Sequence, residues 1–274
     1  MGFFTEIESL EDVPQFEVNK VPVFDGERNS IPGAYSLQRA DTGRHLGMVG
    51  ESYRPIQMEE MVDVIGRASR KIGDIQHVGY TESKGGKKVV IQSKLPEPIN
   101  VDGDKVEPYF YTVVDHSGMG SNKVVPSTIR ISCDNAFHLI KSCADNRAHH
   151  ASTFDDRVKA MIDSIVTSVE SAKNFEGVMK RLKSLKFTKN QMVKLTQKLI
   201  PVEKDESTRR INKREKIVDL FESGRGNCGE TRWDALNALT EYETHNGKQS
   251  AAKFIRNMTN TNLSRQGLTL LTAA

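Results

Sequence analysis

Hydrophobic and polar residues follow two different periods along the chain, and the period changes near residue 150. Between residues 35 and 150, short apolar clusters alternate with polar residues and are separated by glycine-containing turns, as expected of antiparallel strands. From residue 151 onward, apolar residues recur every three or four positions, which indicates amphipathic helices. The pattern predicts an α+β fold, with an antiparallel β-meander and packed helices in the N-terminal half and a mostly helical C-terminal half.

Two β-hairpins are predicted from their turns. The turn Asp41-Thr42-Gly43 separates the apolar clusters of the segment 35–53. The pair Gly85-Gly86 separates two strand-like segments, 74–83 and 87–95. The N-terminal half therefore contains at least four strands that pair locally.

A helix and two further strands complete the predicted N-terminal half. Apolar residues at helical spacing predict an amphipathic helix over residues 57–70. Strands are expected in the segments 108–117 and 124–133, joined by a glycine-rich loop. A helix is expected from Asp134 or Asn135 through Phe137, Leu139 and Ile140, because Asp and Asn are favourable helix caps.

The C-terminal half is predicted to contain successive helices. They are expected to begin near Ser152 or Thr153, at Thr188, at Ser207 and near Thr231. Trp233, on the last of these helices, is expected to belong to the core, and Asn237, if buried, to be satisfied locally.

Four segments follow from these patterns. Residues 1–34 are polar and acidic, contain three prolines and show no sustained period, so they are interpreted as an extended acidic arm. Residues 35–150 form the predicted α+β core domain, residues 151–260 a helical region that packs on it, and residues 261–274 a tail.

Composition narrows the class of protein. The chain is 37% hydrophobic and 27% charged, which is typical of a folded, water-soluble protein. With 274 residues it is long enough to bury a core without metal or disulfide, so no cofactor is expected. The three cysteines include no CxxC pair, which favours a reducing compartment, and we expect the bacterial cytoplasm. No run of about 18 apolar residues is present, so no membrane partner is expected.

The net charge of +3 is small, but its distribution is uneven. The opening arm is acidic, whereas the segment from Lys180 to Lys216 holds thirteen lysines and arginines against four acids. A cluster of cations attracts phosphates, although such residues can equally be the solvated faces of helices.

Basic residues at strands and hairpin tips are the candidate contacts for nucleic acid, because they can neutralise backbone phosphates. The predicted contacts are Lys87, Lys88, Lys123, Arg130, Lys141, Arg147 and His149. Two tyrosines, Tyr53 and Tyr111, are candidates for stacking on bases, although a tyrosine in a strand more often packs in a core.

Catalytic and metal-binding motifs are weakly represented. Cys133, His138, Cys143, His149 and His150 lie close in sequence, but their spacing lacks the tight ligand pairs of structural zinc sites. The segment GRGNCG around Cys228 lacks the ending of a phosphate-binding loop. We therefore expect no metal site and no enzymatic centre.

Three segments of the chain resemble the phage/plasmid-like family catalogued as domain of unknown function number 932. They are GESYRPIQMEE at 50–60, STIRISCDNAF with NRAHHAS between 127 and 152, and TRWDALNALTEYETH at 231–245. Their order and spacing fit the family over about residues 35–246. Asp134, Ala136 and Ala148 depart from the family's blocks, so no residue role is carried over.

The predicted order of elements also resembles, at the level of fold, the core of the eukaryotic-type single-strand annealing recombinases that phages encode. This resemblance implies a phage or plasmid DNA-binding protein of replication or recombination. Such a protein would bind single-stranded DNA by its phosphates, anneal complements without ATP, and assemble into homo-oligomeric rings or filaments. Two alternatives stay open: a non-enzymatic protein-interaction or host-takeover factor, and a metal-dependent nuclease.

Overall fold

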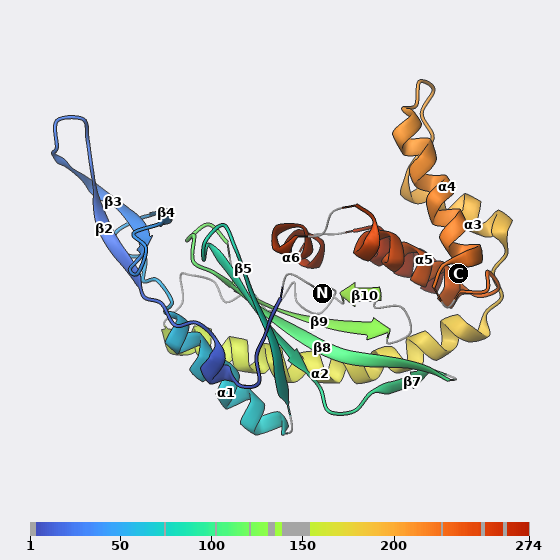
Figure 1. The fold of residues 1–274 in the computed structure, drawn as a ribbon, viewed down its shortest axis with the longest axis horizontal. Helices are drawn as coiled ribbons and strands as arrows, with labels where there is room; N and C mark the ends of the chain where they lie inside the picture. Colours follow the sequence, from blue (N-terminus) through green and yellow to red (C-terminus); the bar gives the residue numbers. More distant parts are fainter. Residues whose placement is uncertain are drawn as a thin grey trace. The chain divides into compact units, whose positions relative to one another are not determined.

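The computed structural model describes most of the chain (Figure 1). The described residues are 4–73, 75–101, 103–120, 122–130, 135–138, 154–225, 227–247, 250–259 and 262–273. They form antiparallel strands in the N-terminal half and helices in the C-terminal half, so the predicted α+β class is confirmed. None of the described helices is long and apolar enough to span a membrane.

The larger sheet of the described chain has seven strands in the order β1–β5–β6–β8–β9–β10, with β7 paired to β8. Its strands are β1 (Thr5–Glu6), β5 (Gln76–Ser83), β6 (Lys88–Lys94), β7 (Ile99–Val101), β8 (Asp104–Asp115), β9 (Lys123–Arg130) and β10 (Asn135–His138). The predicted hairpin around Gly85-Gly86 is confirmed as β5 and β6, which pair antiparallel from Gln76 with Lys94 to Ser83 with Lys88. Most of β8 is buried, as expected of a central strand covered on both faces.

A separate three-stranded sheet contains β2 (Val18–Phe24), β3 (Ser30–Arg39) and β4 (His45–Val49). The hairpin predicted around Asp41-Thr42-Gly43 is confirmed as β3 and β4. Residues 18–24, however, were assigned to an irregular arm, and they pair with β3 instead. Pro22 argues against a central strand, but β2 lies at the edge of its sheet, where a missing N–H is tolerated.

Helix α1 (Met58–Ile72) confirms the helix predicted over residues 57–70. Its buried residues recur at helical spacing and face the core: Met58, Met61, Val64, Ile65 and Ala68. Burial of this stripe is the main source of stability for a helix of this length.

The segment after β9 differs from its prediction. Residues 135–138 form strand β10, not the start of a helix, and they pair antiparallel with residues 127–130 of β9. Four residues of mixed polarity do not distinguish a strand from a helix, and pairing with β9 decides the outcome. Leu139 and Ile140 lie outside the described residues.

The described residues divide into two compact units. Unit 1 comprises those of Met1–Pro96, Phe110–Val125 and Lys141–Val169; unit 2 comprises those of Glu97–Tyr109, Pro126–Ile140 and Glu170–Ala274. These boundaries interleave along the chain, unlike the predicted segments 35–150 and 151–260, because β8 and β9 each contribute residues to both units.

The C-terminal helices begin largely where the sequence predicts. They are α2 (Phe154–Ser184), α3 (Lys189–Leu199), α4 (Thr208–Ser223), α5 (Arg232–His245), α6 (Ala251–Thr259) and α7 (Leu263–Thr272). Thr188 and Thr231 close capping boxes at the starts of α3 and α5, and Ser207 precedes α4. The segment 261–274 is not only a tail, since Leu271 of α7 is buried in the core of unit 2.

The core of unit 2 is built around α5. Trp233 is 5% exposed, as predicted, and its indole Nε1 donates to Asp104 Oδ2 at 3.2 Å. Lys183 Nζ lies 3.4 Å from the same carboxylate oxygen. Asn237 differs from its prediction: it is buried, and its Nδ2 has no hydrogen-bond partner in the part of the chain that the structure describes.

Candidate nucleic-acid interface

Three hairpin turns of unit 1 lie against one another. They are the β3–β4 turn (40–44), the β5–β6 turn (84–87) and the turn after β8 (116–120). The N–H of His116 donates to the carbonyl of Lys87 at 2.9 Å, which joins the second turn to the third. The Arg44 side chain passes over Gly85, where an added Cβ would lie 2.5 Å from it, and this joins the first turn to the second.

The β5–β6 turn owes its shape to consecutive residues with positive φ. Lys84, Gly85 and Gly86 have φ values of 52°, 67° and 94°. Glycine adopts this region without a steric penalty, whereas the conformation at Lys84 costs energy. The turn places the exposed Lys84 and the half-buried Lys87 on either side of the two glycines.

Arg39, at the end of β3, links the β3–β4 turn to the β5–β6 hairpin. Its Nη1 donates to Glu82 Oε2 at 2.8 Å, and its Nε donates to Asp41 Oδ1 at 2.8 Å. The guanidinium lies 4.1 Å from the ring centroid of Phe16, close enough for a cation–π contact. Arg39 is therefore a structural residue, whose charge is matched by two carboxylates.

The other cations of the cluster are less well matched. Lys88 Nζ lies 3.4 Å from Asp115 Oδ2, and that carboxylate also accepts from the N–H of Ser117 at 2.9 Å. Within the described residues, no carboxylate lies within ion-pair distance of Arg44, Lys84 or Lys87. We call Arg44, Lys84, Lys87 and Lys88 the turn cations. Their incomplete pairing leaves a local excess of positive charge that favours phosphate binding.

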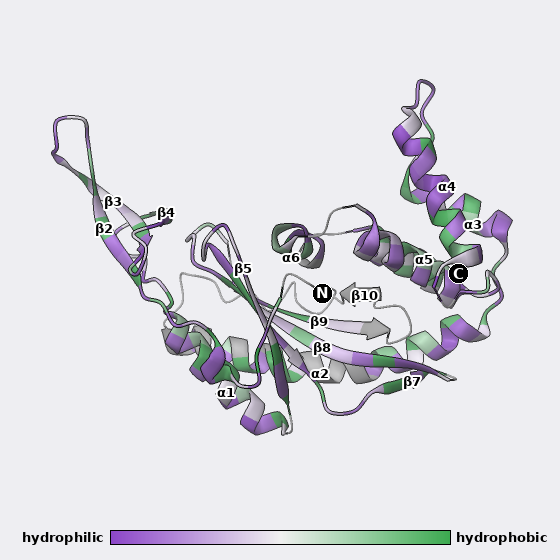
Figure 2. Cartoon of the chain, viewed as in Figure 1, coloured by the Kyte–Doolittle hydropathy of each residue, from purple (hydrophilic) through white to green (hydrophobic). Residues whose placement is uncertain are grey.

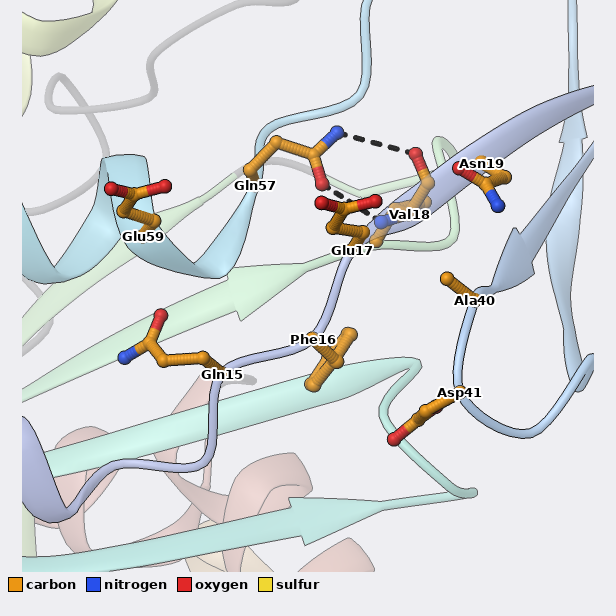
Figure 3. Close-up of a pocket in the computed structure, with 9 residues that line it drawn as sticks. All are labelled: Gln15, Phe16, Glu17, Val18, Asn19, Ala40, Asp41, Gln57 and Glu59. Carbon is orange, nitrogen blue, oxygen red and sulfur yellow. Dashed lines mark hydrogen bonds between the residues drawn. The ribbon is translucent and has the colours of Figure 1, made fainter.

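A cavity of about 640 Å³ lies beside this cluster (Figure 3). Its lining residues are Gln15, Phe16, Glu17, Val18, Asn19, Ala40, Asp41, Gln57 and Glu59. Three of them are carboxylates and none is basic, so the lining repels phosphates. The cavity is therefore not the nucleic-acid contact, although Phe16 and Asp41 belong both to it and to the surroundings of Arg39.

The structure brings together only some of the predicted contacts. Lys87 and Lys88 lie in the turn cluster, and Lys123 begins β9, partly buried, just after the third turn. Arg130 ends β9, where its backbone pairs with Asn135, but its side chain is not among those described. Lys141, Arg147 and His149 lie outside the described residues.

The two predicted stacking residues have different surroundings. Tyr53 is half-buried beside the third turn, where a Cβ at Gly118 would lie 3.6 Å from its ring. Tyr111 is 0% exposed and its hydroxyl accepts from Gln92 Nε2 at 3.2 Å. A fully buried ring is not available to a base, so Tyr111 belongs to the core and is withdrawn as a stacking candidate.

Arg44 was missed in the sequence, as was the anchoring role of Arg39. Both flank the predicted turn Asp41-Thr42-Gly43, which was a local signal that two arginines would lie near each other. Their contact with the glycines of the β5–β6 turn is long-range and has no signal in the sequence.

Most of the candidate metal ligands lie outside the described residues. Among them, no group of three or more His, Cys, Asp or Glu side chains is placed to hold a metal ion. Of the five candidate zinc ligands, His138 ends β10 but its side chain is not described, and Cys133, Cys143, His149 and His150 lie outside that part of the chain.

The fold and this surface define an α+β protein in which hairpin turns from two sheets present a group of cations. The chain belongs to the family described as Domain of unknown function (DUF932), whose model matches residues 45–268. The resemblance seen in the sequence is thereby confirmed for that family. Comparisons with curated proteins and with solved structures found no significant match.

Proposed function

We propose that the protein binds single-stranded DNA and anneals complementary strands without ATP, in phage or plasmid replication or recombination. Three turns converge, and two of them bring Arg44, Lys84, Lys87 and the adjoining Lys88 together; this clustering carries the proposal. Cations brought close together on neighbouring turns raise the local positive potential that attracts phosphates. Annealing breaks no covalent bond, so it requires no hydrolytic centre.

Two further features favour single strands. Tyr53 is partly accessible beside the turns, and a tyrosine there is positioned to stack on an unpaired base. In addition, α1, the antiparallel strands β5 to β10 and then α2 resemble the helix, meander and helix of annealing recombinases. This second feature is an analogy of fold and adds less weight than the charges.

A protein-interaction role is the second candidate, and exposed apolar residues favour it. Phe24 is 56% exposed and Ile31 is 42% exposed, near the two ends of the loop that joins β2 to β3. Exposed apolar side chains that lie close together can mark a protein contact. A homo-oligomeric ring or filament that uses this hairpin is compatible with DNA binding.

Removal of three turn cations is expected to weaken DNA binding. In the variant Arg44→Ala/Lys84→Ala/Lys87→Ala, the plot of log affinity against log salt concentration should become less steep by about 2. Each phosphate contact with a single strand contributes about 0.7 to the steepness of this plot. Fluorescence anisotropy of labelled single- and double-stranded oligonucleotides, between about 50 and 200 mM salt, measures the slope.

The matched control removes three cations from α1 of the same unit, in Arg67→Ala/Arg70→Ala/Lys71→Ala. This variant should keep most of the slope and the affinity. Equal losses in the two variants would show that only bulk charge matters. No binding by the unmodified protein at low salt would reject the proposal and favour a protein partner.

A further inference from the structure

Helix α4 carries a row of cations in unit 2. Arg209, Lys213 and Lys216 are spaced by four and three residues, so they lie along one side of the helix. Arg209 and Lys216 are exposed, and Lys213 is half-buried. Hydrophilic residues dominate α4 in Figure 2. We call these three residues the α4 row.

The other sides of α4 have structural roles. Ile217, Val218 and Phe221 are buried in the core of unit 2. Arg210 and Arg214 pair with Glu203 and Glu206 and donate to backbone carbonyls of the segment that leads into the helix. These two arginines hold that segment in place, and the α4 row takes no part in this.

The α4 row forms none of the ion pairs seen elsewhere on the helix. No ion pair joins Arg209, Lys213 or Lys216 to a carboxylate within the residues that the structure describes. The first turn of α4 contains no acidic residue, so Arg209 adds positive charge to the positive end of the helix dipole. The unpaired positive charges of the row and the repulsion of Arg209 by the helix dipole both destabilise the folded protein. A bound anion would reduce both effects.

Lys213 of the α4 row is also in surroundings that disfavour its positive charge. Burial lowers the pKa of its ammonium group, and Arg209 and Arg210 lower it further, while Glu243 acts in the opposite direction. Its Nζ lies 5.5 Å from the ring centroid of Tyr242 on α5. At this distance Tyr242 makes a cation–π contact with Lys213, the middle residue of the row.

We infer that the α4 row is a second contact for the phosphate backbone of single-stranded DNA, separate from the turn cations of unit 1. The inference rests on the proposed function and extends it to the helical unit. From Arg209 to Lys216 the helix rises about 10 Å. Successive phosphates of one strand lie about 3.4 Å apart along the axis of a duplex and farther apart in an extended single strand. Even at about twice the duplex spacing, the row is long enough to reach two phosphates.

The test compares two variants that each remove two exposed cations from unit 2. The first is Arg209→Gln/Lys216→Gln on α4, and the matched control is Lys194→Gln/Lys198→Gln on α3. The α4 variant is expected to bind a labelled single-stranded oligonucleotide about tenfold more weakly, with a salt slope smaller by about 1.4. The control should bind within about twofold of the unmodified protein.

Thermal unfolding separates loss of contact from loss of structure. Because Arg209 is opposed by the helix dipole, the melting temperature of the α4 variant should be unchanged or higher. Weaker DNA binding with an unchanged melting temperature supports the inference.

The outcomes also separate this inference from the proposal on which it rests. If the unmodified protein binds DNA and loss of the turn cations weakens binding, but the α4 variant behaves like its control, the α4 row is not a contact. If the α4 and α3 variants lose equal affinity, diffuse charge explains binding and the inference is overturned. If the unmodified protein fails to bind DNA, both the proposed function and the inference fail.

Discussion

Replacing Gly47 with alanine is expected to lower the free energy of unfolding by about 3 kcal/mol. Gly47 lies in β4 opposite Leu37, and its Cα faces the turn after β8. An added Cβ would lie 2.0 Å from the carbonyl oxygen of Ser117 and 2.8 Å from its carbonyl carbon. Both are backbone atoms, so no side-chain rotation relieves the clash and one of the two segments must move.

The measurement is urea unfolding followed by far-UV circular dichroism. Gly50→Ala is the matched control, because an added Cβ at Gly50 meets nothing within 4 Å. It should change stability by only a few tenths of a kcal/mol. Should the two variants unfold at the same urea concentration, β4 would not be packed against the turn, and the convergence of the three turns would be wrong.

Acidification from pH 7 to pH 4 is expected to cost about 3 kcal/mol of stability through His116 alone. Burial lowers the pKa of this imidazole from 6.5 to about 4; Asp115 and the backbone of Ile56 raise it slightly, and Arg39 lowers it slightly further. The ring is 2% exposed, packs edge-on against Phe16 and places Nε2 at 3.2 Å from Met58 Sδ. The apolar neighbours Phe16 and Met58 favour the neutral imidazole over the charged one.

The direction follows from the protons bound in each state. Between pH 6.5 and pH 4 the unfolded chain protonates this histidine and the folded chain does not, so stability falls as the pH falls. His77 acts in the same direction, since burial also lowers its pKa to about 4, but its ring is only partly buried and its effect should be smaller.

Urea unfolding at several pH values between 7 and 4 measures this effect. The variant His116→Gln should lose less stability over that range than the unmodified protein, because the titrating group is gone. His45→Gln, at an exposed histidine, should keep the full dependence. An equal loss in His116→Gln and the unmodified protein would assign the dependence to other groups, His77 or the carboxylates.

The parts of the fold that were predicted correctly depend on short-range signals. Gly85-Gly86 and Asp41-Thr42-Gly43 specify turns through their own backbone preferences, and Thr188 and Thr231 cap helices within three residues. The errors come from longer-range effects. Strand β2 was not predicted because Pro22 is compatible with a strand only at the edge of a sheet, and the sequence does not show where that edge lies. Strand β10 was not predicted because it forms by pairing with β9.

The candidate site was only partly predictable for the same reason. Lys87 and Lys88 were found because they follow a glycine turn, but Arg44 joins them through a contact that spans some forty residues of sequence. Tyr111 was misjudged because alternation in a strand does not reveal that both faces of β8 are covered.

Gln57 gives β2 a protected edge. Its side chain accepts from the N–H of Val18 at 2.8 Å and donates to the carbonyl of Val18 at 3.2 Å, as a residue of a neighbouring strand would (Figure 3). In a regular strand, Lys20 and Pro22 point their backbone groups to the same side as Val18, and Pro22 has no N–H to offer. Between Val18 and Pro22, only the N–H of Lys20 therefore remains to bond a strand from another molecule on that side. This edge is a poor template for strand addition and aggregation.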